Sequence, residues 1–157
     1  MTEVRPLHQQ GLISIRETNY TGESVARGVF ADVQLPAGAL IEAAHCIRLP
    51  AVEQREHFQF TVLQHYTFNA DKGDYLLALG IGSLFNHSSS PNVDYRVDTK
   101  HDIIRYFTAR KIAAGEELFI FYGPNLWFTD TRPGADEAAL VEGTAPDDDG
   151  DGLPLGC

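Results

Sequence analysis

Apolar and polar residues alternate over several short stretches of this chain, a pattern typical of half-buried β-strands. Residues 11–16 alternate in this way, and a second stretch at residues 25–31 has a glycine within it. By the same pattern we expect further strands at residues 39–46, 61–68, 75–79, 93–97, 103–108 and 118–122. The polar residues 98–102 lie between two of these stretches and predict a hairpin there.

Glycine and proline separate the expected strands, and little of the pattern is helical. Residues 35–38 (Leu-Pro-Ala-Gly) and 71–74 (Asp-Lys-Gly-Asp) are predicted turns. Residues 50–57 are the one stretch that we expect to form a short helix, with Pro50 in its first turn. Many short strands with little helix indicate a mostly-β domain.

The charge is divided unevenly along the chain. The 157 residues carry a net charge of −10, and from residue 130 onward eight acidic residues stand against one basic residue, so that −7 of the charge lies there. We therefore expect residues 1–130 to form a single domain and residues 131–157 to be an acidic, disordered tail. The domain itself has no basic patch, which argues against direct binding to nucleic acid.

Other sequence features indicate where in the cell the protein is expected. No apolar run has transmembrane length, and the first ten residues lack the pattern of a signal peptide, so we expect no membrane association. Two cysteines, Cys46 and Cys157, provide no disulfide framework and cannot by themselves form a zinc site. The nucleus, the cytoplasm or both are the expected location.

The tripeptide Asn86-His87-Ser88 taken alone is typical of a polar loop that satisfies its own backbone. Its neighbours along the chain change the interpretation. Arg-Gly-Val-Phe-Ala at residues 27–31 precedes it, and Pro-Asn at residues 91–92 follows it closely. Gly-Glu-Glu-Leu at residues 115–118 and Tyr122-Gly123 come later. In order and spacing these segments resemble the SET-domain lysine methyltransferases, over about residues 11–128.

The resemblance implies a SET-domain, β-clip-like fold of several small sheets and a protein-lysine N-methyltransferase that uses S-adenosylmethionine. It also implies site residues. Tyr122 matches the catalytic tyrosine, and the substrate channel is expected at Tyr66 and Ile120. The residues expected to bind the cofactor are Arg27, Gly28, Asn86, His87 and Trp127. Trp127 is also expected to close the channel.

The residue types suit that chemistry. Methyl transfer to an amine is an in-line displacement, so most of the acceleration can come from positioning and charge placement. The lysine amine must first lose a proton, against a pKa of about 10.4 in water. An apolar, aromatic channel beside a positive sulfonium favours that loss. The Tyr122 hydroxyl can orient the amine toward the methyl group.

Three positions depart from the family pattern. Ala26 stands where a glycine is usual, which leaves a backbone contact intact. Ser89 replaces a zinc-binding cysteine, and no Cys-rich segment follows Tyr122, so we predict a metal-free site closed by residues 126–128. Ile120 replaces the Phe or Tyr that limits the number of methyl groups and cannot hold a water in the channel, so we predict a di- or trimethyllysine product.

The resemblance leaves the substrate open. A histone tail, H3 in particular, is the leading candidate, and a ribosomal or translation protein is the alternative. A catalytically silent SET module that binds a partner is a third reading, against which the intact Asn86, His87 and Tyr122 argue. A homodimer that completes the peptide groove is also expected. The other histidines, His45, His57, His65 and His101, show no ligand spacing and are interpreted as surface or core residues.

Overall fold

The computed structural model describes residues 5–18 and 26–130. The expected acidic tail, residues 131–157, and the first residue of the second expected strand lie outside the described residues. In the described part of the chain the strands form two small sheets. The first has the order β1 (Ile13–Thr18), β2 (Ala26–Ala31), β9 (Glu117–Ile120), β6 (Asn86–His87), and the second has the order β4 (Thr67–Asn69), β5 (Tyr75–Ala78), β3 (Leu40–Leu49), β8 (Ile103–Thr108), β7 (Val93–Asp98).

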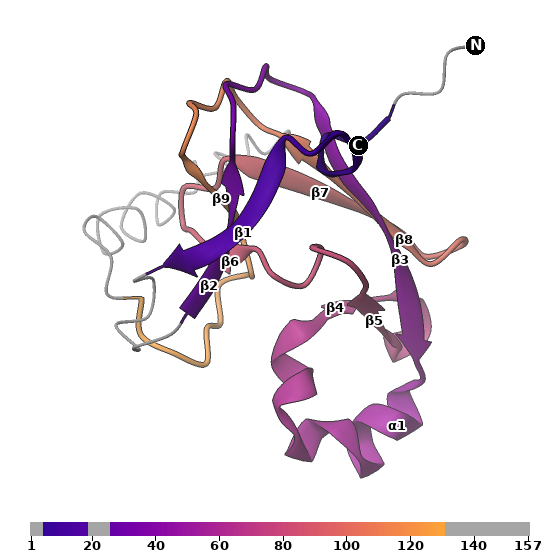
Figure 1. Ribbon diagram of the computed structural model, residues 1–157. Coiled ribbons are helices and arrows are strands. Elements are labelled where there is room, and N and C mark those ends of the chain that lie inside the picture. The colour runs from indigo at the N-terminus through magenta and orange to yellow at the C-terminus, as the bar shows by residue number, and fades with distance from the viewer. Residues whose placement is uncertain (1–4, 19–25, 131–157) are drawn as a thin grey trace, which may run out of the picture.

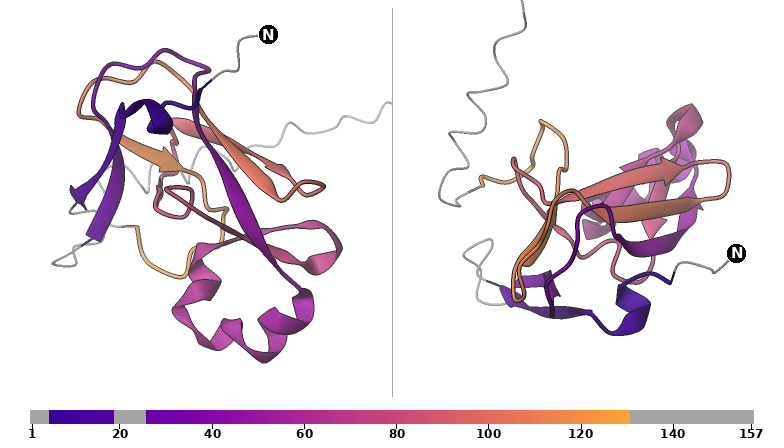
Figure 2. Two further views of the ribbon diagram at one scale, coloured as in Figure 1. Left: turned by 45° about the vertical axis from the view of Figure 1, so that its right-hand side comes forward. Right: turned by 90° about the horizontal axis from the view of Figure 1, so that it is seen from above.

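Helix is confined to short pieces. The described elements are α1 (Ala51–Glu56) and four single turns of 3₁₀ helix, η1 (His8–Gln10), η2 (Phe58–Phe60), η3 (Val62–Tyr66) and η4 (Asp71–Gly73). The helical segment from α1 to η3 gathers at one end of the molecule, and the sheet that contains β1, β2 and β9 lies at the other (Figure 1). The long strand β3 runs between the two ends (Figure 2). This architecture confirms the mostly-β prediction of small sheets with short helices.

Strand β9 brings distant parts of the chain together. It pairs antiparallel with β2, Val29 opposite Leu118, and parallel with β6, His87 opposite Ile120. The parallel pairing was not expected, because residues 86–87 were interpreted as part of a loop. A two-residue strand has no alternating pattern that a sequence could display. As a result, the Asn-His motif lies directly beside the residues that lead into Tyr122.

The strand expected at residues 61–68 is wrong for most of its length. Residues 62–66 form the turn η3, and pairing begins at Thr67, opposite Leu77 of β5. The Thr61 hydroxyl accepts a hydrogen bond from the Leu63 backbone N–H at 3.3 Å and caps the turn. The β-branched and aromatic composition is therefore overridden by a local cap and by a partner strand that is only four residues long.

The remaining elements agree with expectation within a few residues. The hairpin of β7 and β8 is confirmed, and the predicted helix is present as α1, which begins one residue later than expected with Pro50 as its N-cap. Strand β3 runs three residues beyond the expected end, and β9 ends two residues early. The early end of β9 frees residues 121–122 from the sheet. Their side chains can then face the pockets described below.

The core packs closely against the segment between β5 and β6. Tyr106 of β8 is fully buried, and its hydroxyl donates to the Gly82 carbonyl at 2.9 Å. Burial raises the pKa of Tyr106 well above its usual range, so it remains a neutral donor. A Cβ on Gly82 would stand 2.9 Å from the Cβ of Ala78. Residues 79–85 are thus fixed from beneath, which in turn fixes the backbone that leads to Asn86.

Candidate active site

Two cavities meet beside Tyr122. The smaller has a volume of about 190 Å³, and the larger has a volume of about 410 Å³. Six residues border both: His65, Tyr66, Ser83, Phe85, Tyr122 and Trp127. These six shared side chains, most of them aromatic, form the boundary between the two cavities. Two ligands, one in each cavity, would therefore come together at this boundary. We call the smaller cavity the inner pocket and the larger one the outer pocket.

Tyr122 is held at three points. Its backbone N–H donates to His87 Nδ1 at 3.0 Å, and its hydroxyl donates to the Phe85 carbonyl oxygen at 2.5 Å. Its ring stacks on Trp127 with centroids 5.6 Å apart and planes 10° from parallel. Because the single hydroxyl proton is engaged by Phe85, the oxygen can act toward a further partner only as an acceptor.

His87 supports Tyr122 from behind. Its side chain is almost completely buried, 1% exposed, and packs against Phe121 and Tyr122. Since a backbone N–H can only donate, Nδ1 of His87 must be the unprotonated ring nitrogen when it accepts from Tyr122. The expected cofactor-binding residue His87 is therefore placed in the packing beneath the catalytic candidate.

Glu117 occupies the space beside Gly28. A Cβ on Gly28 would stand 2.7 Å from the Glu117 carboxyl carbon and 3.1 Å from Asn86 Nδ2. The carboxylate accepts hydrogen bonds from Asn86 Nδ2 at 2.8 Å and from the Thr18 hydroxyl at 2.8 Å. Asn86 also donates to the Arg27 carbonyl at 3.0 Å. Gly28 is thus required because a carboxylate and an amide lie against its backbone.

Asn92 connects the Asn-His segment to β9. It is 2% exposed, and its Nδ2 donates to the Glu117 carbonyl at 2.8 Å and to Glu116 Oε1 at 3.0 Å. Its Oδ1 accepts from the Phe119 N–H at 2.7 Å. A buried amide that forms these bonds fixes the register of two neighbouring segments. Asn92 of the Pro-Asn motif therefore has a structural role, which is to hold this segment against β9.

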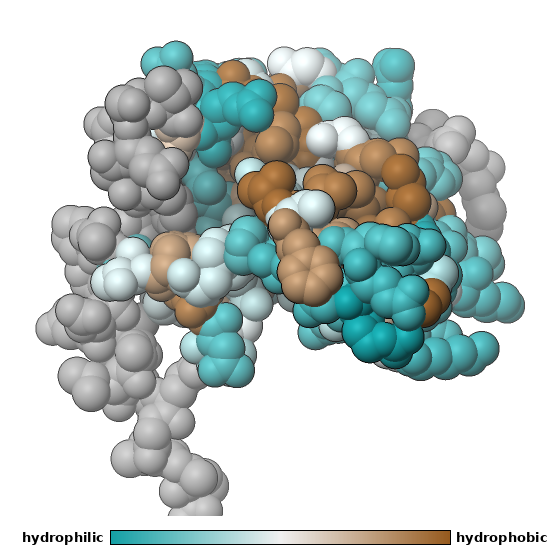
Figure 3. Space-filling model, turned by 90° about the horizontal axis from the view of Figure 1, so that it is seen from below, coloured by the Kyte–Doolittle hydropathy of each residue, from teal (hydrophilic) through white to brown (hydrophobic). Residues whose placement is uncertain are grey.

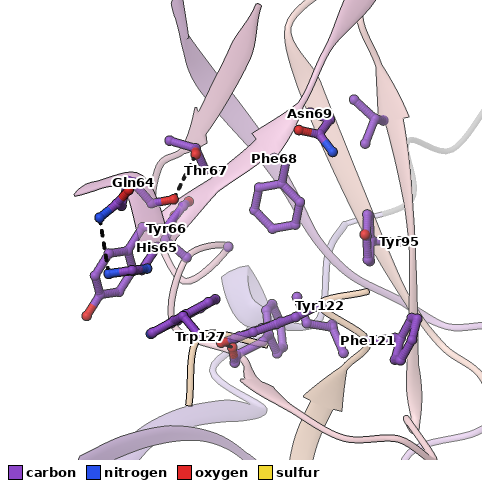
Figure 4. A pocket seen from close by; sticks show the side chains of 15 residues that line it. Gln64, His65, Tyr66, Thr67, Phe68, Asn69, Tyr95, Phe121, Tyr122 and Trp127 are labelled. Carbon is purple, nitrogen blue, oxygen red and sulfur yellow. Dashed lines mark hydrogen bonds between the residues drawn. The ribbon is translucent and has the colours of Figure 1, made fainter. Parts of the chain in front are cut away.

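Six of the eight predicted site residues border the pockets, and Gly28 and His87 line neither. Arg27 and Asn86 line the outer pocket, and Ile120 lines the inner one. Tyr66, Trp127 and Tyr122 border both. Figure 4 shows the aromatic side chains arranged around the inner pocket, with Trp127 and Tyr122 side by side. Residues that lie 95 positions apart in the sequence, from Arg27 to Tyr122, thus converge on one region.

Three residues at this site were missed from the sequence. Glu117 was quoted only as part of Gly-Glu-Glu-Leu, and His65 was interpreted as surface or core. Tyr95 was given no role, but it lines the inner pocket together with Tyr122. Burial raises the pKa of Tyr95, so its hydroxyl stays protonated. Nothing in the local sequence distinguishes these three, because each acts through a partner that only the fold supplies.

The described residues contain neither a metal-binding cluster nor a membrane-spanning helix. Within residues 5–18 and 26–130, no three His, Cys, Asp or Glu side chains gather so as to hold a metal ion. Cys46 is a free thiol, and burial raises its pKa to about 11. No helix among the same residues is long and apolar enough to cross a membrane.

Comparisons with known proteins give a consistent result. The family model described as "SET domain" matches residues 26–123. A histone-lysine N-methyltransferase of Schizosaccharomyces pombe, specific for H3 lysine-37, is 38% identical over 143 residues, which are 91% of this chain and 90% of that protein. The crystal structure of a Plasmodium falciparum protein proposed to be a histone methyltransferase has a TM-score of 0.56 and 24% identity. It covers 73% of this chain and 96% of its own and shares the fold.

Proposed function

Because this chain belongs to the SET-domain family and is a protein-lysine N-methyltransferase that uses S-adenosylmethionine, we propose that its substrate is a lysine of the histone H3 tail. The relative from S. pombe supports this substrate, and lysine-37 of H3 is the first residue to test. The observation that carries the chemistry is the meeting of the two pockets at Tyr122. The same substrate implies a role in chromatin and a location that includes the nucleus.

The outer pocket fits the cofactor in size and lining. Its volume of about 410 Å³ falls in the range of about 300–1,000 Å³ that is usual for ligand pockets. Arg27 and Asn86 line it with polar groups, and Trp127 and Phe128 line it with aromatic rings. S-adenosylmethionine supplies a methyl group on a positively charged sulfur, which suits aromatic faces. We assign Arg27, Asn86 and Trp127 to contacts with the cofactor, with Gly28 and His87 supporting them from behind.

The inner pocket suits a lysine side chain. Tyr66, Phe85 and Tyr95 give it apolar walls, which disfavour the ammonium form of the amine. Tyr122 lies at its junction with the outer pocket and can accept a hydrogen bond from an amine N–H, since its own proton is held by Phe85. In this proposal Tyr122 orients the amine and does not remove its proton.

The number of methyl groups depends on the space and the water in the inner pocket. Ile120 contributes no hydroxyl, which supports a di- or trimethylated product. Tyr95 brings a hydroxyl to the same pocket, however, so a water could be held there instead. Comparison of Tyr95→Phe with the wild type separates the two: an added methyl group in the variant would assign the limit to Tyr95.

The experiment is methylation of recombinant H3, of intact nucleosomes and of a ribosomal fraction, read by mass spectrometry with excess cofactor. We expect modification of one H3 lysine. A Tyr122→Phe variant should lose on the order of 10²-fold in kcat, because the amine is no longer oriented, while calorimetry still detects cofactor binding. Methylation of a ribosomal protein but not of H3 would overturn the substrate assignment. Failure to bind cofactor would favour a silent module.

We also propose a homodimer. Several large apolar side chains of the segment from α1 to η3 are exposed: Val52 (44%), Phe60 (77%), Val62 (65%) and Leu63 (43%). The space-filling view of the underside, where this segment lies, shows apolar surface gathered beside hydrophilic side chains (Figure 3). An apolar patch of this kind is a candidate for contact with a second protein surface. Val62 also lines the outer pocket, so the contact would border the site.

A further inference from the structure

Trp127 lies between two other rings. Its indole stacks on the His65 imidazole with centroids 4.4 Å apart and planes at 21°, and on Tyr122 with centroids 5.6 Å apart and planes at 10°. The tryptophan is nevertheless 52% exposed. A side chain this exposed is held mainly by what lies against its two faces, and stacked aromatic pairs add to the stability given by burial alone.

The stack joins parts of the chain that are not otherwise adjacent in sequence. His65 belongs to η3, Tyr122 follows β9, and Trp127 belongs to the C-terminal segment of the domain. In the described part of the chain, the segment around Trp127 has no regular secondary structure, so backbone pairing does not fix it. His65 itself is half-buried and lies near Gln64, with 3.5 Å between the two Nε2 atoms.

All three rings border both pockets. The indole is therefore part of the wall across which cofactor and lysine must meet. If it tilts away from Tyr122, the inner pocket loses one side and the outer pocket loses the face that we assign to the cofactor. Transfer between two bound groups is sensitive to displacements of about 1 Å.

We propose that His65 is a positioning residue of the methyltransferase: its imidazole holds Trp127 against Tyr122 and so fixes the wall between the two pockets. The role rests on the proposed assignment of the pockets. It requires a flat ring at position 65, because the contact is a stacked face. A phenylalanine should substitute for the histidine, and an alanine should not.

Trp127 provides a direct readout, because it is the one tryptophan of the chain. Tryptophan fluorescence of the whole protein thus reports on this ring alone. In His65→Ala, we expect red-shifted emission and easier quenching by acrylamide, as the indole loses its cover. In His65→Phe, both properties should remain close to those of the wild type. His45→Ala, which removes an exposed imidazole from β3, is the matched control and should change neither.

Kinetics on the same variants test the functional part. We expect kcat/KM for the peptide to fall about three- to tenfold in His65→Ala, in keeping with the loss of one stacked pair, and to be restored in His65→Phe. The melting temperature should change little, since His65 lies outside the core. Unchanged acrylamide quenching in His65→Ala would overturn the contact. Altered quenching with unchanged kcat/KM for the peptide and unchanged affinity for the cofactor would overturn its role.

The two proposals can fail separately. If no H3 peptide is methylated by the wild type, the substrate assignment fails. Fluorescence quenching and cofactor affinity in the His65 variants still test the positioning role, because neither measurement requires a peptide.

Discussion

At the scale of single residues, Gly28 matters because it has no side chain, which leaves room for neighbouring groups. The space that a Cβ would fill is taken by the Glu117 carboxylate and the Asn86 amide. These two groups, with Thr18, form a small hydrogen-bonded cluster behind the outer pocket. The cluster fixes Asn86, and Asn86 in turn borders the pocket.

Gly28→Ala should therefore displace the Glu117 carboxylate. We expect a loss of about 1–3 kcal/mol in the free energy of unfolding, as is usual for overpacking. Weaker cofactor binding should accompany it, because Asn86 loses its partner. Denaturant unfolding and calorimetry with the cofactor measure the two effects. In the double variant with Glu117→Ala, the alanine at position 28 should cost much less, because the clash is gone. Equal costs in both backgrounds would contradict this account.

Residues whose own side-chain type suits the chemistry could be predicted from the sequence. Residues that matter only through a contact with another, distant residue could not. Tyr122, Tyr66 and Trp127 were identified from the motif, and the fold brings all three to the wall between the pockets. Glu117 and His65 were missed, because one matters only beside a glycine 89 positions away and the other only beside an indole 62 positions away.

At the scale of elements, β9 depends on the turn that precedes it. Glu116 accepts hydrogen bonds from Arg110 at 2.5 Å, from the Ala113 backbone N–H at 2.9 Å and from Asn92 at 3.0 Å. The Arg110 guanidinium is the main cause that lowers the pKa of Glu116 to about 2, against the opposing effect of partial burial. One carboxylate thus fixes both the entrance to β9 and the Asn92 loop.

Glu116 gives the stability a defined dependence on pH. Because its pKa falls from 4.5 to about 2 on folding, its contribution is fully present above pH 4.5 and is lost as the pH falls toward 2. Denaturant unfolding across this range should show a decline that is shallower in Glu116→Gln. The exposed Glu56→Gln is the control and should decline like the wild type. Parallel curves for all three proteins would rule out this role for Glu116.

Strands were predicted correctly where apolar and polar residues alternate along the whole strand. The predictions failed where this alternation is absent or does not decide the structure. The β7–β8 hairpin has six paired residues on each side and was predicted. Strand β6 has two residues and was not, because its existence depends on β9 lying beside it. Residues 62–66 have the composition of a strand, but the Thr61 cap turns them into η3.

At the scale of the whole molecule, the proposed dimer can be tested at its most exposed apolar position. Phe60 is 77% exposed. A charge there would be buried without a partner if a second chain covered it, at high cost. We expect a native mass of two chains for the wild type and of one chain for Phe60→Glu, measured by light scattering. Gln9→Glu, which adds the same single charge at an exposed position in η1, should leave the mass unchanged. A monomeric wild type would contradict the dimer.

The pairing of β9 with both β2 and β6 also determines when the first sheet can form during synthesis of the chain. Strand β9 lies near the C-terminal end of the described residues and its partner β2 lies near their N-terminal end, so the first sheet can close only after residues 117–120 have been synthesised. Contacts between such distant segments form slowly, because loop-closure entropy must be overcome before they add stability. A nascent chain released before residue 117 would have Arg27 and Asn86 but no strand to bring them together. With Arg27 and Asn86 as the proposed cofactor contacts, the enzyme becomes able to bind its cofactor only after β9 has paired with β2 and β6.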